Sequence, residues 1–152
     1  MGCRCVVLPI QAGLVFPRSG WPLHITLVRF DTRETAEAVR SRLDGVLPAQ
    51  LGFGVPIGTD ALFGRDGSVP VSLVELEPTL QLLHEATLEA LGPRVHLPGA
   101  RHNRSNYRPH VTHAGERLRP GDKVRIRQAA LVDMRPDGEP RLRRVLAVWE
   151  PG

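Results

Sequence analysis

The feature that most constrains the fold of this chain is a pair of similar segments, 86 residues apart. Residues 21–26 (WPLHIT) and 107–112 (YRPHVT) share an aromatic residue, a histidine, a β-branched residue and a threonine at the same offsets. Each segment has the residue pattern of a β-strand or of the edge of one. A repeat of this kind predicts a fold made of two similar halves, each of which contributes one strand of the same design.

The alternation of a β-strand places the histidine and threonine of each segment on one face. Residues two apart point the same way, so His24 and Thr26 share a face, and so do His110 and Thr112. The β-branched residue between them points toward the core. With 6 histidines and 7 threonines in 152 residues, chance predicts about 0.3 His-x-Thr tripeptides. Two such tripeptides, both in strand-like segments, indicate a functional motif.

Paired histidines suit acid–base chemistry at a phosphodiester. The unperturbed pKa of histidine lies near 6.5, so one imidazole can be neutral while another is protonated. Each proton-transfer role typically contributes about 10²–10⁴-fold to the rate. Threonine hydroxyls and neighbouring arginines can donate hydrogen bonds to the non-bridging phosphate oxygens. This chemistry requires neither a metal ion nor a cofactor.

The remaining sequence predicts strands and helices around the two motifs. A helix is expected over residues 33–46, capped by Asp31 or Thr32, and another over 78–91, between Pro78 and Gly92. Turns are expected at residues 58–60 and 66–67. Strands are expected over residues 4–9, 23–30, 51–57, 61–63, 69–76, 110–114, 123–132 and 141–149. This order favours a single α+β domain over residues 1–152, with two lobes and largely antiparallel sheets.

Composition is typical of a globular protein and excludes several other classes. Hydrophobic residues make up 41% of the chain and charged residues 24%, which excludes a disordered tail. No apolar run approaches the ~20 residues needed to cross a bilayer, so we expect a cytoplasmic protein with no membrane partner. The two cysteines, Cys3 and Cys5, are interpreted as reduced thiols at the start of a strand.

Charge is unevenly distributed along the chain. Residues 1–92 carry 7 basic and 10 acidic side chains, whereas residues 93–152 carry 13 basic and 6 acidic ones. The segment from Arg94 to Arg127 contains 9 of these basic residues and brackets the second motif. We therefore expect this segment to shape an anion-binding cleft beside His110.

Further candidates for substrate binding lie next to the motifs. Arg104, Asn106 and Arg108 belong to the basic, polar stretch that leads into the second motif, and could contact phosphate or ribose. Trp21 and Tyr107 could stack on a base, and core packing is an equally good reading of both.

The other histidines are assigned no catalytic role. His84 in the second helix and His96 in the following loop are expected to have structural roles, at the surface or half-buried. His110 and His113 have the spacing of two metal ligands, but no third ligand is suitably placed. Strand alternation turns His113 away from the cleft.

At the level of motifs, the chain resembles the 2H phosphoesterase superfamily. His24-Ile25-Thr26-Leu27 and His110-Val111-Thr112 are similar to its paired H-x-T/S motifs, although the family usually has an aliphatic residue where this chain has His113. The superfamily includes proteins similar to 2′-5′ RNA ligases and 2′,3′-cyclic phosphodiesterases. The resemblance implies a bilobal fold with two pseudo-symmetric antiparallel sheets, flanking helices and a central cleft. It also implies that His24, Thr26, His110 and Thr112 form the catalytic site.

Three functions follow as alternatives. The first is a metal-independent phosphodiesterase that acts on RNA ends or small nucleotides, by 2′,3′-cyclic phosphate hydrolysis or 2′-5′ phosphodiester chemistry. The second is a phosphodiesterase that degrades cyclic di- or oligonucleotide immune signals, as compact phage-borne members of the family do. The third is an RNA- or nucleotide-binding domain without turnover, in which the basic C-terminal portion contacts phosphates and the histidines are incidental.

Overall fold

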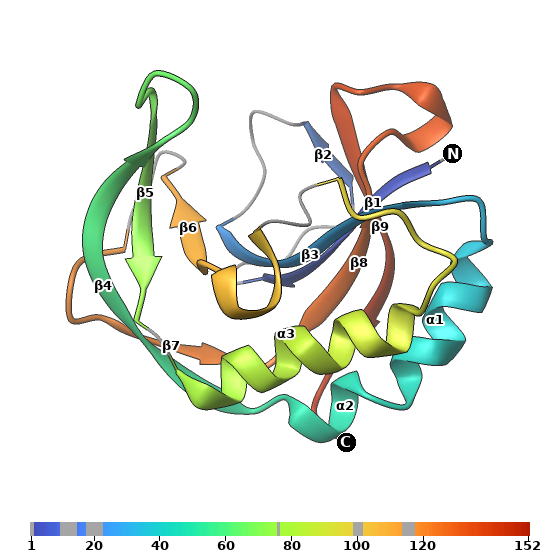
Figure 1. Cartoon of the computed structure of the whole chain (residues 1–152), viewed down its shortest axis with the longest axis horizontal. Coiled ribbons are helices and arrows are strands. Elements are labelled where there is room, and N and C mark those ends of the chain that lie inside the picture. The colour runs from blue at the N-terminus through green and yellow to red at the C-terminus, as the bar shows by residue number, and fades with distance from the viewer. Residues whose placement is uncertain (1, 10–14, 18–22, 76, 99–101, 114–117) are drawn as a thin grey trace.

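The computed structural model describes residues 2–9, 15–17, 23–75, 77–98, 102–113 and 118–152 (Figure 1). Its elements, in chain order, are β1 (Gly2–Pro9), β2 (Val15–Pro17), β3 (His24–Thr32), α1 (Ala36–Asp44), α2 (Leu47–Gln50), β4 (Phe53–Phe63), β5 (Val69–Val74), α3 (Pro78–Leu91), the 3-10 turn η3 (Arg104–Asn106), β6 (His110–Thr112), β7 (Lys123–Ile126), β8 (Ala129–Asp133), the 3-10 turn η4 (Pro136–Gly138) and β9 (Leu142–Trp149).

The strands form two antiparallel groups that meet at the centre of the molecule. Within the described residues the strand order is β2-β9-β8-β1-β3-β6-β5-β4-β7. Strands β3 and β6 are the inner edges of the two groups, and they join through one residue pair, Ile25 with Val111. The expected α+β fold of antiparallel strands with flanking helices is confirmed, and the two groups expected as separate sheets join into one nine-stranded sheet within the described residues. Each lobe contributes one of the two motif-bearing strands.

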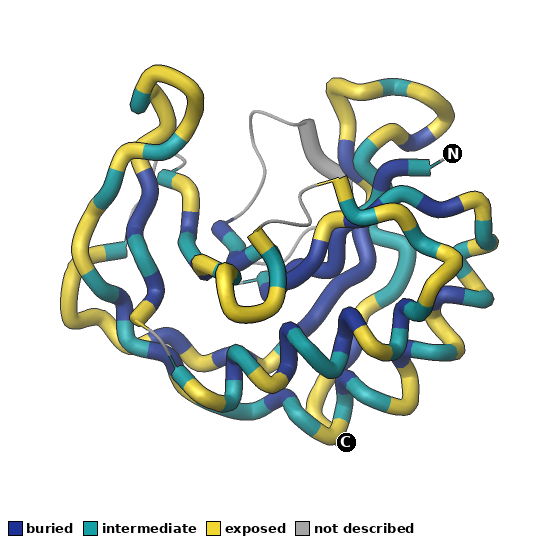
Figure 2. Tube along the Cα trace, viewed as in Figure 1, coloured by how far each residue is buried: buried dark blue, intermediate teal, exposed yellow. Residues whose placement is uncertain are grey.

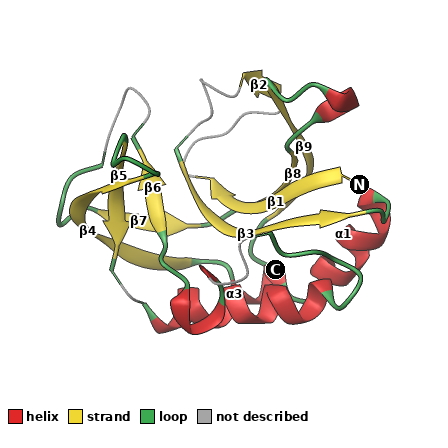
Figure 3. Cartoon of the chain, turned by 45° about the horizontal axis from the view of Figure 1, so that its top comes forward, coloured by secondary structure: helices red, strands yellow, loops and turns green. Residues whose placement is uncertain are grey.

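The helices lie together on one side of the curled sheet (Figures 1 and 3). Helix α3 runs from Pro78 to Leu91, with Gly92 as its C-cap, as its sequence predicts. Helix α1 starts later than expected. Thr35 caps it by accepting a hydrogen bond from the amide of Ala38 at 3.1 Å, whereas the hydroxyl of Thr32 accepts one from the amide of Glu34, before the helix.

The expected turn at residues 58–60 does not exist. Strand β4 runs unbroken from Phe53 to Phe63, and its pairing with β5 shifts register between Ile57 and Asp60. An irregularity of this kind accommodates Gly58 and its neighbours within the strand. The turn expected at residues 66–67 is confirmed, and Gly67 adopts the positive φ of 67° that glycine tolerates best.

The strand expected over residues 123–132 is two strands that belong to different lobes. β7 pairs with β4 at the outer edge of one group, whereas β8 pairs with β1 and β9 in the other. The break falls at residues 127–128, where the chain crosses from one lobe to the other. The sequence does not reveal such a crossing, because neither glycine nor proline interrupts residues 123–132.

The core lies between the sheet and the helices, where the tube in Figure 2 is dark blue. A smaller cluster covers the other face of β1 and β8, and consists of Cys5, Val7, Ala130 and Val132. Every described helix falls short of the length and apolarity needed to cross a membrane.

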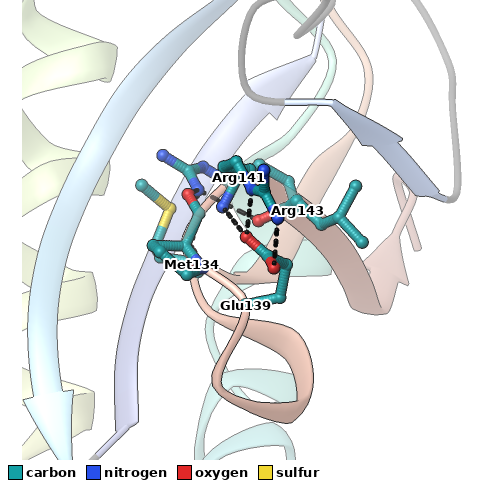
Figure 4. Close-up of polar contacts among 6 residues, drawn as sticks. Met134, Glu139, Arg141 and Arg143 are labelled. Carbon is teal, nitrogen blue, oxygen red and sulfur yellow. Dashed lines mark hydrogen bonds and ion pairs between the residues drawn. The ribbon is translucent and has the colours of Figure 1, made fainter.

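The connection between β8 and β9 is held by a buried arginine (Figure 4). Arg143 is 6% exposed, and its Nη1 donates to the carbonyl oxygens of Met134, Pro140 and Leu142 at 2.8–3.0 Å. Beside it, Arg141 pairs with Glu139 at 2.9 Å. These contacts fold the connection back onto β9.

Candidate active site

The two His-x-Thr motifs lie side by side because their middle residues pair with each other. Ile25 and Val111 are opposite one another in the antiparallel strands β3 and β6, and are 0% and 1% exposed. Their neighbours on either side must therefore point to the opposite face of the sheet. Four side chains with hydrogen-bonding groups consequently share that face: His24, Thr26, His110 and Thr112.

The antiparallel register sets the arrangement of these four side chains. With Ile25 opposite Val111, His24 lies opposite Thr112 and Thr26 lies opposite His110. The two histidines are then diagonal neighbours, whose α-carbons in such a pairing are about 7–8 Å apart. His24, Thr26 and His110 are partly exposed and Thr112 is exposed. One phosphate group between the two imidazoles could be contacted by both.

His110 is held in a defined tautomer. Its Nδ1 lies 2.9 Å from the carbonyl oxygen of Arg108, and a carbonyl oxygen only accepts, so Nδ1 carries the proton and donates. In the neutral ring this leaves Nε2 with a lone pair. Burial lowers the pKa of His110, and the charge of Arg108 lowers it further against the opposing effect of the backbone hydrogen bond. A neutral imidazole at pH 7 is suited to accept a proton.

Phe63, the last residue of β4, packs against His110. Its ring meets the His110 ring edge-on, with centroids 4.6 Å apart and planes at 66°. The guanidinium of Arg108 lies over the same phenyl ring, 4.9 Å from its centroid. Phe63 therefore orients both residues. It lies far from both motifs in the sequence, and its strand pattern alone does not identify it as a site residue.

A β-bulge brings an additional arginine to the same face. Val28 pairs with Val6 and Thr26 with Val7, so Leu27 is an extra residue in β3. Beyond it the alternation is reversed, and Val28 is buried while Arg29 is exposed. Arg29 thus shares a face with Thr26. Strict alternation from His24 assigns Arg29 to the core. The sequence signal of the bulge is the pair of adjacent apolar residues, Leu27 and Val28, between polar ones.

The bulge is anchored by His84 of α3. Its role is structural, as expected, but it is 0% exposed and not at the surface or half-buried. Its Nδ1 donates to the carbonyl oxygen of Leu27 at 2.8 Å, and its Nε2 accepts from the amide of Arg104 at 2.9 Å. Gln81 donates to the carbonyl oxygen of Arg104 at 2.6 Å. These side chains hold Arg104 at its positive φ of 57°, which is unfavourable for a non-glycine residue.

Tyr107 connects this anchor to the first motif. Its ring stacks on His84, and its hydroxyl donates to the carbonyl oxygen of Thr26 at 2.9 Å. Burial raises the pKa of Tyr107 well above its ordinary value, so the hydroxyl remains a donor. Tyr107, three residues before the second motif, therefore fixes the backbone of the first.

A hollow of about 1220 Å³ opens beside the motifs. Thr26 and His110 line it, and so do Tyr107 and Arg108, whereas Arg104 is exposed outside it and Trp21 lies outside the described residues. The other side chains that line it are Leu27, Val28, Arg29, Leu62, Phe63, Leu97, Pro98, His102 and Asn103, together with Gly64. Its described lining contains two arginines and two histidines and no carboxylate.

The expected contribution of the basic C-terminal segment is only partly correct. Among the described basic residues between Arg94 and Arg127, Arg108 lines the hollow, whereas Lys123 and Arg125 lie on the edge strand β7. The second arginine of the lining, Arg29, comes from the half of the chain with a net negative charge. The two arginines of the described lining therefore come one from each half of the chain.

His113 lies outside this lining, as strand alternation predicts. Its Nε2 is 3.0 Å from the hydroxyl oxygen of the buried Ser72, a residue that pairs with Val111 and shares its face. Among the described residues, no group of three or more His, Cys, Asp or Glu side chains is arranged around a common point as metal ligands would be.

Comparison with known proteins agrees with this geometry. The family model described as the 2′-5′ RNA ligase superfamily matches residues 11–146. No curated protein sequence matches the chain. A crystal structure of a phosphoesterase superposes with a TM-score of 0.62 at 15% identity, covering 99% of this chain and 98% of the other. Crystal structures of E. coli LigT complexed with phosphate and with 3′-AMP superpose with TM-scores of 0.61 and 0.59, at 15% and 16% identity, covering 99% of this chain and 97% and 98% of theirs.

Proposed function

Because the chain belongs to the 2′-5′ RNA ligase superfamily, we propose that it is a metal-independent phosphodiesterase that acts on RNA ends or small nucleotides through His24 and His110. The observation that carries the proposal is the pairing of Ile25 with Val111, which puts two imidazoles and two hydroxyls on one face of the sheet. The E. coli LigT structures with phosphate and 3′-AMP add a relative of the same fold that binds such groups.

The proposed reaction is the opening of a 2′,3′-cyclic phosphate to a 2′-phosphate. The Nε2 atom of His110 takes a proton from a water molecule, whose oxygen forms a bond to phosphorus. The bond from phosphorus to the 3′ oxygen breaks, and His24 gives its proton to that oxygen. The tautomer and lowered pKa of His110 support its role as the base in this direction. In 2′-5′ ligation a 5′-hydroxyl takes the place of the water molecule, and the two histidines keep these roles. The roles exchange in the reverse reactions, in which the 3′ oxygen attacks phosphorus and the cyclic phosphate forms again.

The remaining groups of the site are proposed to bind the phosphate. The hydroxyls of Thr26 and Thr112 donate to its non-bridging oxygens, where charge increases in the transition state. Arg108, held over Phe63, supplies a cation beside His110. Tyr107 is proposed to contribute to substrate binding by keeping Thr26 in place and by forming part of the wall of the hollow.

A substrate panel tests the proposal. The protein is assayed in EDTA with 2′,3′-cyclic nucleotides, 2′-5′-linked dinucleotides and cyclic dinucleotides, the last being the substrate class expected of an enzyme that degrades immune signals. His24→Ala and His110→Ala should each reduce turnover by about 10²–10⁴-fold while nucleotide binding persists. His96→Ala, at an exposed position in the loop after α3, is the matched control.

Two results would contradict the proposal. The first is a folded wild-type protein that forms no product from any of these substrates. The second is nucleotide binding that weakens steeply with salt and is unaffected by His24→Ala, with no turnover, which would indicate a binding domain. If His110 is the base, the acid limb of the kcat/KM profile should have its midpoint below pH 6.5 and should be lost in His110→Ala.

A further inference from the structure

Arg29 occupies a position in the hollow that the acid–base reaction does not use. It is exposed, it lines the same hollow as Thr26 and His110, and the bulge at Leu27 puts it on their face of the sheet. Along β3 it lies three residues beyond Thr26, in the direction away from His24. Strand rise makes that separation about 10 Å along the backbone, which the bulge shortens. A group bound by Arg29 is therefore displaced from the phosphate between the histidines.

Arg29 carries a permanent positive charge. The described lining of the hollow contains no carboxylate that could neutralise this charge. A hydrogen bond with the Cys3 side chain has the largest effect on the pKa of Arg29. It raises this pKa, so the guanidinium stays charged. Asp31, two residues along the strand, interacts with it electrostatically but does not line the hollow. His102 and Asn103 line the hollow from the segment that precedes β6. This combination favours an anionic group with several acceptor oxygens.

The volume of the hollow also indicates a ligand with more than one anionic group. Its volume of about 1220 Å³ exceeds the ~300–1,000 Å³ of typical small-molecule sites, so it has room for more than one phosphate group and its ribose. Two arginines line it, one beside His110 and one at Arg29. A ligand that binds both arginines has two negatively charged groups at separate positions.

We propose that Arg29 forms a second anion subsite, which binds the 5′-phosphate group of the nucleoside whose 2′,3′-cyclic phosphate reacts. The inference rests on the proposed function for the identity of the reacting group. A nucleotide with a cyclic phosphate has its other phosphate on the 5′ side, either as a terminal monoester or as the diester that links it to the preceding nucleotide. The guanidinium binds the oxygens common to both forms.

Binding measurements test the subsite without requiring turnover. Calorimetry compares adenosine 2′-monophosphate with adenosine 2′,5′-bisphosphate in the wild type, Arg29→Gln and Arg40→Gln. The wild type should prefer the bisphosphate by about 10-fold or more, as expected for a charged hydrogen bond. Arg29→Gln should reduce that preference to near one. Arg40→Gln, an exposed position on α1 on the helix side of the sheet, should retain it.

Turnover measurements identify the source of the 5′-phosphate group. The substrates are 2′,3′-cyclic AMP, its 5′-phosphorylated form and a diadenylate that ends in a 2′,3′-cyclic phosphate. A higher kcat/KM for both phosphorylated substrates, lost in Arg29→Gln and partly retained in Arg29→Lys, supports an RNA end. A gain confined to the monoester supports a mononucleotide.

The failure of this inference can be distinguished from the failure of the proposed function. Equal affinity of the wild type for the two adenosine ligands, or a preference that survives Arg29→Gln, would overturn the subsite even if turnover is observed. Conversely, no turnover of any substrate together with a bisphosphate preference that depends on Arg29 would overturn the proposed phosphodiesterase and retain the subsite.

Discussion

The imidazole ring of His84 lies flat against the phenol ring of Tyr107, with centroids 3.9 Å apart and planes 5° apart. Neither residue belongs to a His-x-Thr motif, yet the pair connects both. His84 donates to the carbonyl oxygen of Leu27 at the bulge that follows the first motif, and Tyr107 stands three residues before His110. The hydroxyl of Tyr107 bonds the backbone of Thr26. The stack therefore supports the alignment of the two motif strands, which pair directly at a single residue pair.

Replacing His84 by Asn or by Gln should show separately what each of its two hydrogen bonds contributes to stability. In His84→Asn the side-chain amide can replace Nδ1 as donor to Leu27, but the amide of Arg104 loses its acceptor. In His84→Gln the side-chain oxygen can replace Nε2, but the carbonyl of Leu27 loses its donor. Each variant leaves a buried polar group unpaired, so urea unfolding should show a loss of about 1–3 kcal/mol.

The stack also predicts an effect on catalysis. We expect both His84 variants to reduce kcat more than they raise KM, because the catalytic groups lose their alignment. Glu89→Gln, at an exposed position on α3, is the control. His84 variants that match the control in stability and kcat would show that the stack does not position the motifs.

The phenol of Tyr107 should not ionise in the folded protein at its ordinary pKa of 10.0. Burial raises this pKa, because the phenolate would lose its hydration inside the protein. The chain has one tyrosine, so the ultraviolet absorbance of tyrosinate reports this residue alone. We expect the absorbance to rise only with unfolding, and Tyr107→Phe should abolish the signal. Half-titration near pH 10 in the folded state would contradict the burial of the hydroxyl.

Stability should decrease as the pH falls below the ordinary histidine value of 6.5. Burial lowers the pKa values of both His84 and His110 in the folded state. Below 6.5 the unfolded chain therefore binds protons that the folded protein does not, and the free energy of unfolding falls. Above 6.5 both rings are neutral in either state, and this contribution is fully present.

Denaturant unfolding across this pH range measures the effect. His84→Asn should reduce the dependence of the unfolding free energy on pH, whereas His96→Asn, at an exposed position, should preserve it. A protein whose stability is constant, or rises, between pH 7 and pH 5.5 would contradict the prediction.

The thiol of Cys5 should be inert in the folded protein. Burial raises its pKa from 9.0 to about 12, and the side chain packs with Val7, Ala130 and Val132. Because the thiolate is the reactive form, a thiol reagent at pH 8 should modify Cys5 only after unfolding. The variant Cys3→Ser isolates this signal, and the same variant in denaturant gives the full signal as the control. Rapid modification of the native variant would show that Cys5 is accessible.

Much of the local structure could be predicted from the sequence. Helix α3 begins and ends where Pro78 and Gly92 predict, because these residues act on the backbone within one turn. The turn-like sequence Gly58-Thr59-Asp60 was misleading, because glycine is equally compatible with an irregular strand. The division of residues 123–132 between two lobes was also not predictable, since it depends on which distant strands offer free edges.

The candidate site shows the same division. The shared face of His24 with Thr26, and of His110 with Thr112, was predictable from the sequence, because alternate residues of a strand point the same way. Their catalytic role stays a prediction. Arg29 and Phe63 were not identified. The position of Arg29 depends on a bulge that reverses the alternation, and Phe63 reaches His110 only through the pairing of β5 with β6 and β4.

The sequence by itself determined that this chain has two strands of one design and that each presents a histidine and a threonine together. Only the tertiary structure decided that these strands are neighbours, because the contact of Ile25 with Val111 closes a loop of 86 residues. The same holds for His84, which the sequence shows as one polar residue in an amphipathic helix. Its role depends on two backbone groups, of Leu27 and Arg104, that come within hydrogen-bonding distance only when the whole fold has formed.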